Sequence, residues 1–189
     1  MIFASTPISG AFVIRLEKRE DDRGFFARVW CKREFAENGI DVDMVQANIS
    51  HNRSVGTLRG MHFSRQPSRE GKLVSCGRGK IFDVIVDLRP ESPTYLRHFG
   101  VQLDEASREA VYIPPGVAHG FQTLEADSDV FYMMSDFYKP DLADGVRYDD
   151  PAFGIEWPLP VSVIAERDRL YPDFDRETHT ARHALHQVA

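Results

Sequence analysis

The strongest structural signal in the sequence is Tyr112-Ile113-Pro114-Pro115-Gly116-Val117-Ala118-His119-Gly120-Phe121. Two prolines followed by a glycine are typical of a tight turn, because proline fixes φ and glycine tolerates positive φ. Aromatic and β-branched residues flank the turn, as expected of strands. The stretch predicts a turn between strands, with the His119 imidazole directed at whatever the turn faces.

Similar strand signals recur at short intervals along the chain, separated by turn residues. They predict strands at 11–16, 24–30, 44–50, 57–63, 72–75, 81–88, 98–103, 110–113, 120–124 and 130–137. About ten short strands in one unit indicate an all-β sandwich or barrel. A short helix is predicted at 32–38, where Gly39 ends it, and another from Ser162 after the Asp- and Pro-rich loops around Trp157.

Length and charge limit the possible partners. The chain has 189 residues, with 23 Lys and Arg against 29 Asp and Glu, for a formal net charge of −6. We expect a single domain over residues 1–189, with 175–189 as a peripheral C-terminal tail. A net negative charge gives no general attraction to nucleic acid or to an anionic membrane, so neither is expected as a partner. An anionic ligand therefore needs a local basic cluster.

Cysteine usage and the N-terminus favour a cytoplasmic protein. Cys31 and Cys76 are too few for a disulfide framework or a four-thiolate metal site. No basic region precedes an apolar stretch at the N-terminus, and no window approaches the run of about eighteen apolar residues that spans a membrane.

Three histidines lie in the tail at helical spacing, namely His179, His183 and His186. This spacing places them on one helix face. No carboxylate or cysteine completes a metal-ligand set with them. We expect a solvated terminal helix and assign these histidines no role.

Chemically active side chains are densest in Gly56-Thr57-Leu58-Arg59-Gly60-Met61-His62-Phe63, which Lys72-Leu73-Val74 follows. In a regular strand Arg59 and His62 point to opposite faces. If both serve one site, the strand needs an irregularity, and Gly60 is the natural place for a bulge. The alternative for His62 is a core histidine bonded to a backbone carbonyl.

The Pro-x-Gly-x-x-His turn resembles the second motif of the cupin barrel. Metal-binding cupins carry His-x-His in the first motif, whereas the matching strand here reads His62-Phe63-Ser64. A single histidine there does not complete a metal site, so we expect neither metal nor cofactor. Histidine, lysine, arginine and tyrosine without metal suit acid–base chemistry on an anionic substrate. No Gly-x-Ser-x-Gly motif supports covalent hydrolysis.

Taken together, the motifs resemble those of the dTDP-4-dehydrorhamnose 3,5-epimerase family, from about residue 10 to 173. The matching segments are 22–26 (Asp-Arg-Gly-Phe-Phe), 46–50 (Gln-Ala-Asn-Ile-Ser), 56–62, 72–74, 83–89, 113–121, 149–151, 157–158 and 167–168. The resemblance implies a cupin-type double-stranded β-helix, or jelly-roll barrel, with a few short, mostly C-terminal helices. It implies an isomerase that inverts carbons beside the 4-keto group of a nucleotide sugar.

The resemblance also assigns catalytic roles by position. His62 matches the base that removes the proton alpha to the ketone, and Asp168 pairs with it as an orienting carboxylate. Lys72 matches the group that stabilises the enolate oxygen. Tyr132 matches the acid that reprotonates the carbon from the opposite face, its alternative being one more packed aromatic side chain.

The remaining matched residues are assigned to the nucleotide. Arg23 and Arg59 are expected to bind the diphosphate through charge-assisted hydrogen bonds. Polar contacts are expected from Gln46, Asn48, His119 and Arg167, and base stacking from Tyr138. Arg23 alone would be read as an exposed arginine in a turn, and Tyr138 alone as an exposed loop aromatic.

Two departures concern acidic positions near the ligand. Arg28 stands where many family members have glutamate after Arg-Gly-Phe-Phe, and Ala143 stands where they carry a glutamate on the nucleotide side. The nucleotide and sugar are therefore open on the sequence alone. The family is also typically homodimeric through exchange of an N-terminal strand, which residues 2–14 would supply.

The leading hypothesis is a cofactor-free epimerase acting at C3, with or without C5, on dTDP-4-dehydro-6-deoxy-D-glucose in deoxysugar biosynthesis. Alternatives are a C3-only epimerase on a CDP or GDP sugar, a nucleotide-sugar 3,4-ketoisomerase, and a non-catalytic cupin that binds a sugar nucleotide. The string from Gly56 to His62 argues against the ketoisomerase. A metal-dependent oxygenase is not expected.

Overall fold

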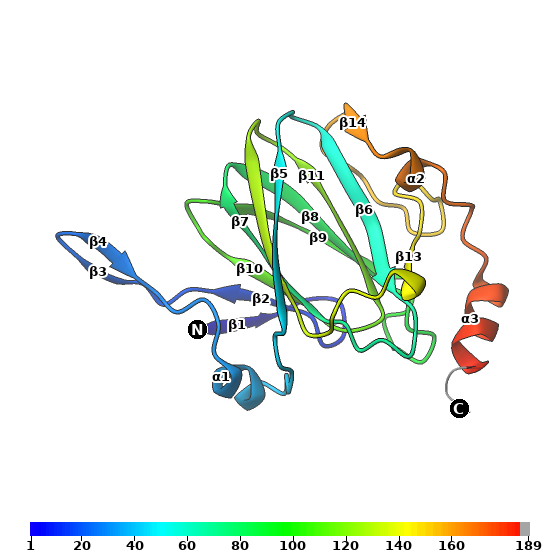
Figure 1. Cartoon of the computed structure of the whole chain (residues 1–189), viewed down its shortest axis with the longest axis horizontal. Helices are drawn as coiled ribbons and strands as arrows, with labels where there is room; N and C mark the ends of the chain where they lie inside the picture. The colour runs from blue at the N-terminus through cyan, green and yellow to red at the C-terminus, as the bar shows by residue number, and fades with distance from the viewer. Residues whose placement is uncertain (186–189) are drawn as a thin grey trace.

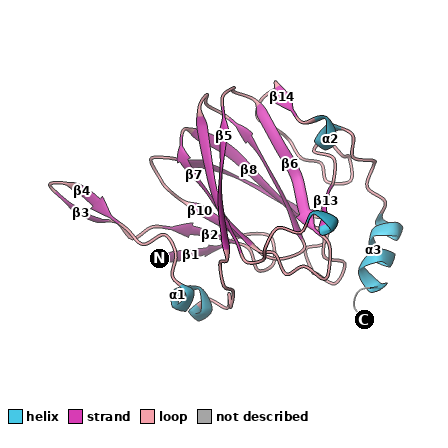
Figure 2. Ribbon diagram, in the orientation of Figure 1, coloured by secondary structure: helices cyan, strands magenta, loops and turns pink. Residues whose placement is uncertain are grey.

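Two β-sheets packed face to face form the body of the protein in a computed structural model that describes residues 1–185 (Figures 1 and 2). The first is six-stranded, in the order β1 (Ile2–Ser5), β2 (Phe12–Arg15), β10 (Ala110–Ile113), β7 (Lys72–Arg78), β12 (Ser128–Met134) and β5 (Gln46–Asn52). The second runs β13 (Ala143–Gly145), β6 (Thr57–Ser64), β11 (Val117–Thr123), β8 (Lys80–Asp87) and β9 (His98–Asp104), and β14 (Val163–Ile164) lies parallel to β6. The predicted all-β, cupin-type barrel is thereby confirmed.

The other elements lie around this barrel. Strands β3 (Arg19–Asp21) and β4 (Gly24–Phe26) form a separate two-stranded hairpin that projects from the body (Figure 1). The helices are α1 (Lys32–Glu37), the 3₁₀ helix η1 (Pro140–Leu142), α2 (Glu166–Arg169) and α3 (Arg176–Leu185). Within the described residues, no helix combines the length and the apolar character that crossing a bilayer requires.

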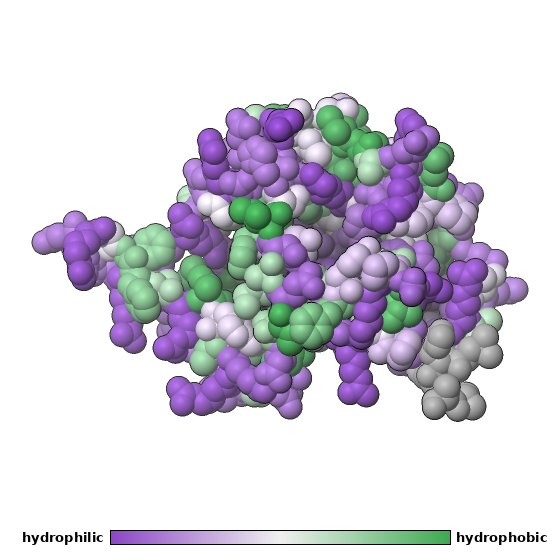
Figure 3. All heavy atoms as spheres, in the orientation of Figure 1, coloured by the Kyte–Doolittle hydropathy of each residue, from purple (hydrophilic) through white to green (hydrophobic). Residues whose placement is uncertain are grey.

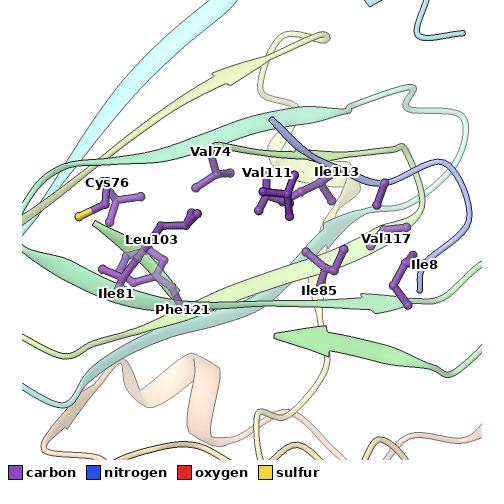
Figure 4. Close-up of a cluster of buried hydrophobic side chains, with 13 residues drawn as sticks. Ile8, Val74, Cys76, Ile81, Ile85, Leu103, Val111, Ile113, Val117 and Phe121 are labelled. Carbon is purple, nitrogen blue, oxygen red and sulfur yellow. The ribbon is translucent and has the colours of Figure 1, made fainter. Parts of the chain in front are cut away.

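The main core fills the space between the two sheets (Figure 4). Strand alternation directs Val74 and Val111 inward from the first sheet and Ile81 and Ile85 inward from the second, and all four are at most 1% exposed. Burial of an aliphatic side chain of this size contributes about 1.5–3 kcal/mol. This apolar packing holds both sheets in fixed register below the polar end of the barrel.

Segments outside the two sheets partly cover the outer face of each sheet. Helix α1 inserts the fully buried Phe35 against the outer side of the first sheet, beside Tyr112. Residues 146–174, here called the C-terminal strap, cover the outer side of the second sheet with Val146 and Phe153. The strap therefore belongs to the packed structure and can position side chains at the barrel opening.

Several predicted boundaries were wrong. The strand predicted at 24–30 ends at Phe26, and the strand predicted from Gly120 begins at Val117, directly after the Pro-Gly turn. Short strands such as β1, β3 and β13 were not predicted as strands, because three or four residues show no measurable alternation. Within the described chain β1 pairs with β2, and the expected exchange of residues 2–14 with a second copy stays a prediction.

The predicted C-terminal helix forms as α3 and most of its described side chains are exposed, but two of its histidines contact the barrel, which was not predicted. His179 on α3 is half-buried, its Nε2 lies 2.7 Å from the carbonyl oxygen of Leu88, and its ring packs near Phe63 and Phe174. His183 lies 3.0 Å from a carboxylate oxygen of Glu91. Residues 186–189, including His186, lie outside the described residues.

Candidate active site

A cavity of about 740 Å³ opens between the two sheets at the polar end of the barrel. Its walls come from six strands, β5, β6, β7, β11, β12 and β13, and from the C-terminal strap. The predicted site residues that line it are Gln46, Asn48, Arg59, His62, Lys72, His119, Tyr132, Tyr138, Arg167 and Asp168. The volume matches that of a pocket for a ligand much larger than a monosaccharide.

Strand alternation explains why the first-sheet residues share this cavity. On β5, Gln46 and Asn48 face inward while the intervening Ala47 and Ile49 face solvent. Tyr132 on β12 stands opposite Asn48 in the strand pairing. Lys72, at the start of β7, stands opposite Met134, the residue two places beyond Tyr132 on the same face.

An irregularity in β6 brings Arg59 and His62 to the same face, as predicted from the sequence. His119 of β11 pairs with His62 of β6, and Phe121 of β11 pairs with Arg59 of β6. Two residues therefore lie between Arg59 and His62, but only one lies between His119 and Phe121. The extra residue is accommodated at Gly60, whose φ is +117°. A side chain there would lie 2.6 Å from the Cα of Gly120, so only glycine fits.

His62 and Asp168 form a hydrogen-bonded pair across the site. His62 Nε2 lies 2.8 Å from Asp168 Oδ1, and the Gly60 N–H donates to the other carboxylate oxygen at 3.1 Å. Burial alone raises the pKa of Asp168, but hydrogen bonds from His62 and Gly60 and the charge of Arg167 lower it below its usual value. An ionised Asp168 accepts the Nε2 hydrogen and leaves Nδ1 of His62 as the basic nitrogen.

A second histidine–carboxylate pair lies beside the first. His119 Nε2 is 2.7 Å from Asp83 Oδ2, and the Asp83 side chain is 0% exposed. This contact fixes the orientation of the His119 ring at the cavity wall. Sequence reasoning did not identify Asp83, although its place on the inward face of β8 between Ile81 and Ile85 marks a buried charge that requires a partner.

Lys72 and Tyr132 occupy the opposite wall. The Lys72 ammonium lies 2.9 Å from a carboxylate oxygen of Glu70, and both side chains are mostly buried. Burial raises the pKa of Tyr132, the negative charge of Glu70 raises it further, and Arg59 partly offsets both. Tyr132 is therefore a neutral phenol, able to donate a proton, throughout the physiological pH range.

The outer part of the cavity is lined with groups suited to a diphosphate and a flat base. The Arg59 Nε donates to Asn52 at 2.7 Å, which fixes its guanidinium. The Arg167 guanidinium lies 3.1 Å from His62 Nε2. The Gln46 amide oxygen accepts from the backbone N–H of Tyr138 at 3.2 Å, and the Tyr138 side chain is 54% exposed.

Arg23 is the predicted site residue that the structure does not bring to the cavity of its own chain. Its side chain is 90% exposed and pairs with Asp21 within the β3–β4 hairpin. Of the two departures, Ala143 lines the cavity, while Arg28 pairs with Glu34 of α1 at 2.7 Å. Ala143 therefore removes a carboxylate from the wall, whereas Arg28 acts in this chain as a surface ion-pair partner.

Several further lining residues were missed from sequence, among them the ionisable Glu70, Asp144 and Tyr171. Glu70 lies two residues before Lys72, a spacing that puts both side chains on one face of an extended segment. Tyr171 of the C-terminal strap shows no comparable sequence signal, because the strap reaches the cavity by an irregular path. Within residues 1–185, no cluster of three or more His, Cys, Asp or Glu side chains is arranged to hold a metal ion.

Comparison with known proteins agrees with this geometry. A model of the dTDP-4-dehydrorhamnose 3,5-epimerase family matches residues 5–176. The dTDP-4-dehydrorhamnose 3,5-epimerase of Sinorhizobium fredii is 40% identical over 173 residues, covering 91% of this chain and 89% of the relative. That of Methanothermobacter thermautotrophicus is 42% identical over 170 residues, covering 88% and 91%. The crystal structure of NovW, a 4-keto-6-deoxy sugar epimerase from the novobiocin biosynthetic gene cluster of Streptomyces spheroides, matches with a TM-score of 0.89 at 36% identity, covering 97% of this chain and 92% of NovW.

Proposed function

Because this chain belongs to the dTDP-4-dehydrorhamnose 3,5-epimerase family, we propose that it inverts C3 and C5 of dTDP-4-dehydro-6-deoxy-D-glucose in deoxysugar biosynthesis. The observation that supports this most directly is the arrangement of the cavity. The His62–Asp168 pair lies on one side, and Lys72 and Tyr132 lie on the other. A base and an acid on opposite walls can remove and return a proton on opposite faces of one carbon.

The proposed reaction needs only side chains of this chain. His62 Nδ1 accepts the proton alpha to the C4 ketone, and Asp168 stabilises the imidazolium that forms. The electron pair of the broken C–H bond moves to the ketone oxygen, where Lys72 stabilises the enolate. Tyr132 then donates its proton to the carbon from the other face, and solvent restores both residues to their starting protonation states.

We assign the outer groups to the nucleotide. Arg59 and Arg167 suit the diphosphate, because guanidinium groups make bidentate charge-assisted hydrogen bonds to phosphate oxygens. Gln46, Asn48 and His119 supply further polar contacts, and the exposed Tyr138 ring is available for stacking on the base. Thymine is the base expected, since the relatives carry dTDP in their names.

Solvent deuterium incorporation tests the reaction. Incubation with the dTDP-linked 4-keto sugar in D₂O should introduce deuterium at C3 and C5. Proton NMR follows this incorporation. Label at C3 alone would correct the proposal to a single-centre epimerase. Absence of label with dTDP, CDP and GDP versions of the sugar would refute epimerase activity. His62→Ala should abolish exchange while binding of dTDP, measured by calorimetry, persists.

We further propose that the working form is a homodimer in the cytoplasm. Two exposed apolar surfaces support association. On the β3–β4 hairpin, Phe25 and Phe26 are 44% and 69% exposed. On the outer face of the first sheet, the cross-strand neighbours Ile49 and Phe131 are 68% and 39% exposed. In Figure 3 hydrophobic atoms follow directly behind the hydrophilic tip of the projecting hairpin. Apolar surface of this kind marks interaction sites.

The hairpin also accounts for Arg23. A hairpin that extends away from its own barrel can carry Arg23 to the cavity of a second copy, where it would join Arg59 at the diphosphate. Free thiols at Cys31 and Cys76 are consistent with the reducing cytoplasm. Sedimentation equilibrium tests the assembly: a monomer at micromolar concentration would contradict it, and Phe26→Asp should weaken a dimer.

A further inference from the structure

Besides Asp168, the described residues that line the cavity include two carboxylates, Asp144 and Glu70, and the reaction scheme gives Glu70 no task. Glu70 lies in the segment between β6 and β7, and its side chain is 4% exposed. Ionised carboxylates are rarely buried to this extent unless they are paired. Its partner is the Lys72 ammonium at 2.9 Å. In the part of the chain that the structure describes, no other carboxylate lies within ion-pair distance of Lys72.

The backbone around Glu70 is held firmly in place. The Glu70 N–H donates to the Ser68 hydroxyl at 3.2 Å. The neighbouring Gly71 N–H donates to the Ser135 hydroxyl at 2.8 Å, and that hydroxyl donates to the carbonyl of Arg69 at 3.0 Å. These bonds tie both sides of Glu70 to the end of β12, the strand that carries Tyr132. The carboxylate is therefore a fixed anchor rather than a mobile surface charge.

Lys72 needs such an anchor because its side chain has four rotatable bonds and a point charge at its end. An ammonium that must meet a developing enolate oxygen has to be oriented before the reaction, since preorganised donors cost no reorganisation in the transition state. Backbone pairing fixes only the Cα of Lys72, opposite Met134 and Ile113. Its contact with Glu70 fixes the other end of the side chain.

We propose that Glu70 is a positioning residue for the proposed epimerisation, which holds the Lys72 ammonium at the enolate oxygen and places a negative charge in the cavity that Tyr132 lines. This inference rests on the proposed function of the same cavity. Both effects act on the step after substrate binding. Glu70 itself exchanges no proton with the sugar and is not a catalytic residue.

The charge of Glu70 gives the proposal a signature in the pH profile. The carboxylate raises the pKa of Tyr132, in addition to the larger effect of burial. Other ionisable groups reach the same cavity from every element around Tyr132: Arg59 and His62 from β6, Lys72 from β7, His119 from β11, Tyr138 after β12, Asp144 from β13, and Arg167, Asp168 and Tyr171 from the C-terminal strap. Removal of Glu70 leaves these groups in place, so the alkaline limb of kcat should move to lower pH.

The test is Glu70→Gln, which keeps the shape and removes the charge. We expect kcat to fall by about 10–100-fold, because the ammonium is no longer fixed, while KM changes by less than about threefold. The alkaline limb of the kcat profile should move to lower pH. Glu70→Asp keeps the charge but draws it back by one methylene, so kcat should fall while the alkaline limb stays in place.

Asp150→Asn is the matched control. Asp150 is a buried carboxylate at 3% exposure that accepts backbone hydrogen bonds outside the cavity, so its amide variant should leave the pH profile unchanged. A Glu70→Gln variant with wild-type kcat and an unmoved alkaline limb overturns the positioning role. If Glu70→Gln does not fold, the kcat of Glu70→Asp is the test, and a wild-type kcat for Glu70→Asp overturns the positioning role equally. Absence of turnover by the wild-type protein would instead refute the proposed function.

Discussion

At the scale of single residues, the site depends on contacts between groups far apart in the sequence. His62 and Asp168 are 106 positions apart, yet their side chains lie 2.8 Å from each other. Asp168 is 2% exposed and also binds the Gly60 N–H. A carboxylate held in this way orients the imidazole and compensates the charge that it acquires.

Asp168→Asn is therefore expected to lower kcat by about 10³–10⁴-fold, because an amide can impose the wrong histidine tautomer and cannot compensate the imidazolium. Turnover measured by NMR checks this. Asp83→Asn provides the comparison, since it disturbs the neighbouring His119 pair on the binding side and should mainly raise KM. If Asp168→Asn and Asp83→Asn lowered kcat equally, the His62–Asp168 pair would have no special role in turnover compared with the His119–Asp83 pair.

The residue types at the site were predictable from the sequence because the motifs are dense and specific around His62, Lys72 and His119. The need for a bulge at Gly60 followed from the parity of strand positions alone. The destination of Arg23 was not predictable, because it depends on the direction in which the hairpin leaves the barrel. Asp83 and Glu70 were missed because a buried carboxylate is recognised by its partner, which the sequence does not display.

At the scale of elements, the irregularity in β6 lets one strand bring both Arg59, the proposed diphosphate ligand, and His62, the proposed base, to the cavity. Gly60 packs directly against β11, where an added Cβ would lie 2.6 Å from Gly120 Cα and 2.7 Å from the His119 carbonyl oxygen. Both neighbours are backbone atoms and cannot rotate away. The close approach of the two strands thus fixes the register that sets the His62–His119 pair.

Gly60→Ala should lower the free energy of unfolding by more than Gly24→Ala. The two glycines have similar φ values, +117° and +121°, but a Cβ on Gly24 meets nothing within 4 Å. Gly24→Ala should cost about 1–3 kcal/mol for backbone strain alone. Gly60→Ala should add at least about 2 kcal/mol for the clash. Urea unfolding of both variants measures the difference, and equal losses would show that β6 and β11 can separate.

Helix α3 should dock on the barrel in a pH-dependent manner. Burial lowers the pKa of His179 below its usual 6.5, and the charges of His183 and Arg182 act in the same direction. The undocked tail therefore binds a proton more readily, so docking is strongest above about pH 6.5 and weakens as the pH falls below it. Amide exchange in α3, corrected for intrinsic rates, should rise from neutral pH to about pH 5.5. His179→Gln should abolish that pH dependence, and an unchanged dependence in this variant would exclude His179 as its source.

Element positions were predictable to different degrees for physical reasons. Long, mostly buried strands such as β6 and β8 were found within a residue of their observed ends. The 24–30 prediction failed beyond Phe26 because the chain leaves the hairpin there: Val29 is 59% exposed, and Trp30 packs against Phe35 of α1 instead of pairing in a sheet. The burial of His179 depends on Phe63 and Phe174, which are distant in sequence, so helical spacing alone could not indicate it.

At the scale of the whole molecule, the net charge of −6 coexists with a cavity in which cationic and anionic side chains are balanced. Arg59, Lys72 and Arg167 line the cavity with two histidines and with Glu70, Asp144 and Asp168, while acidic residues outnumber basic ones elsewhere. This distribution suits one small diphosphate ligand and disfavours an extended polyanion, whose charges would meet the acidic surface.

A complementation experiment tests whether two copies share their sites. Arg23→Ala and His62→Ala chains, co-expressed with different tags and purified as a heterodimer, should recover activity that neither homodimer shows. If Arg23 serves the partner cavity, the Arg23→Ala chain keeps His62 and receives an intact Arg23 from the other copy. If Arg23 acts within its own chain, both sites of the heterodimer are defective and no activity returns.

The place of Asp168 after the sheet strands has a consequence for biosynthesis. All strands of the two sheets except β14 are complete by Gly145, so the strands that carry His62 and Lys72 precede the strap during translation. Asp168 can reach His62 only after residues 146–168 have been synthesised. A nascent or prematurely terminated chain that stops short of α2 therefore carries a His62 imidazole without its carboxylate partner.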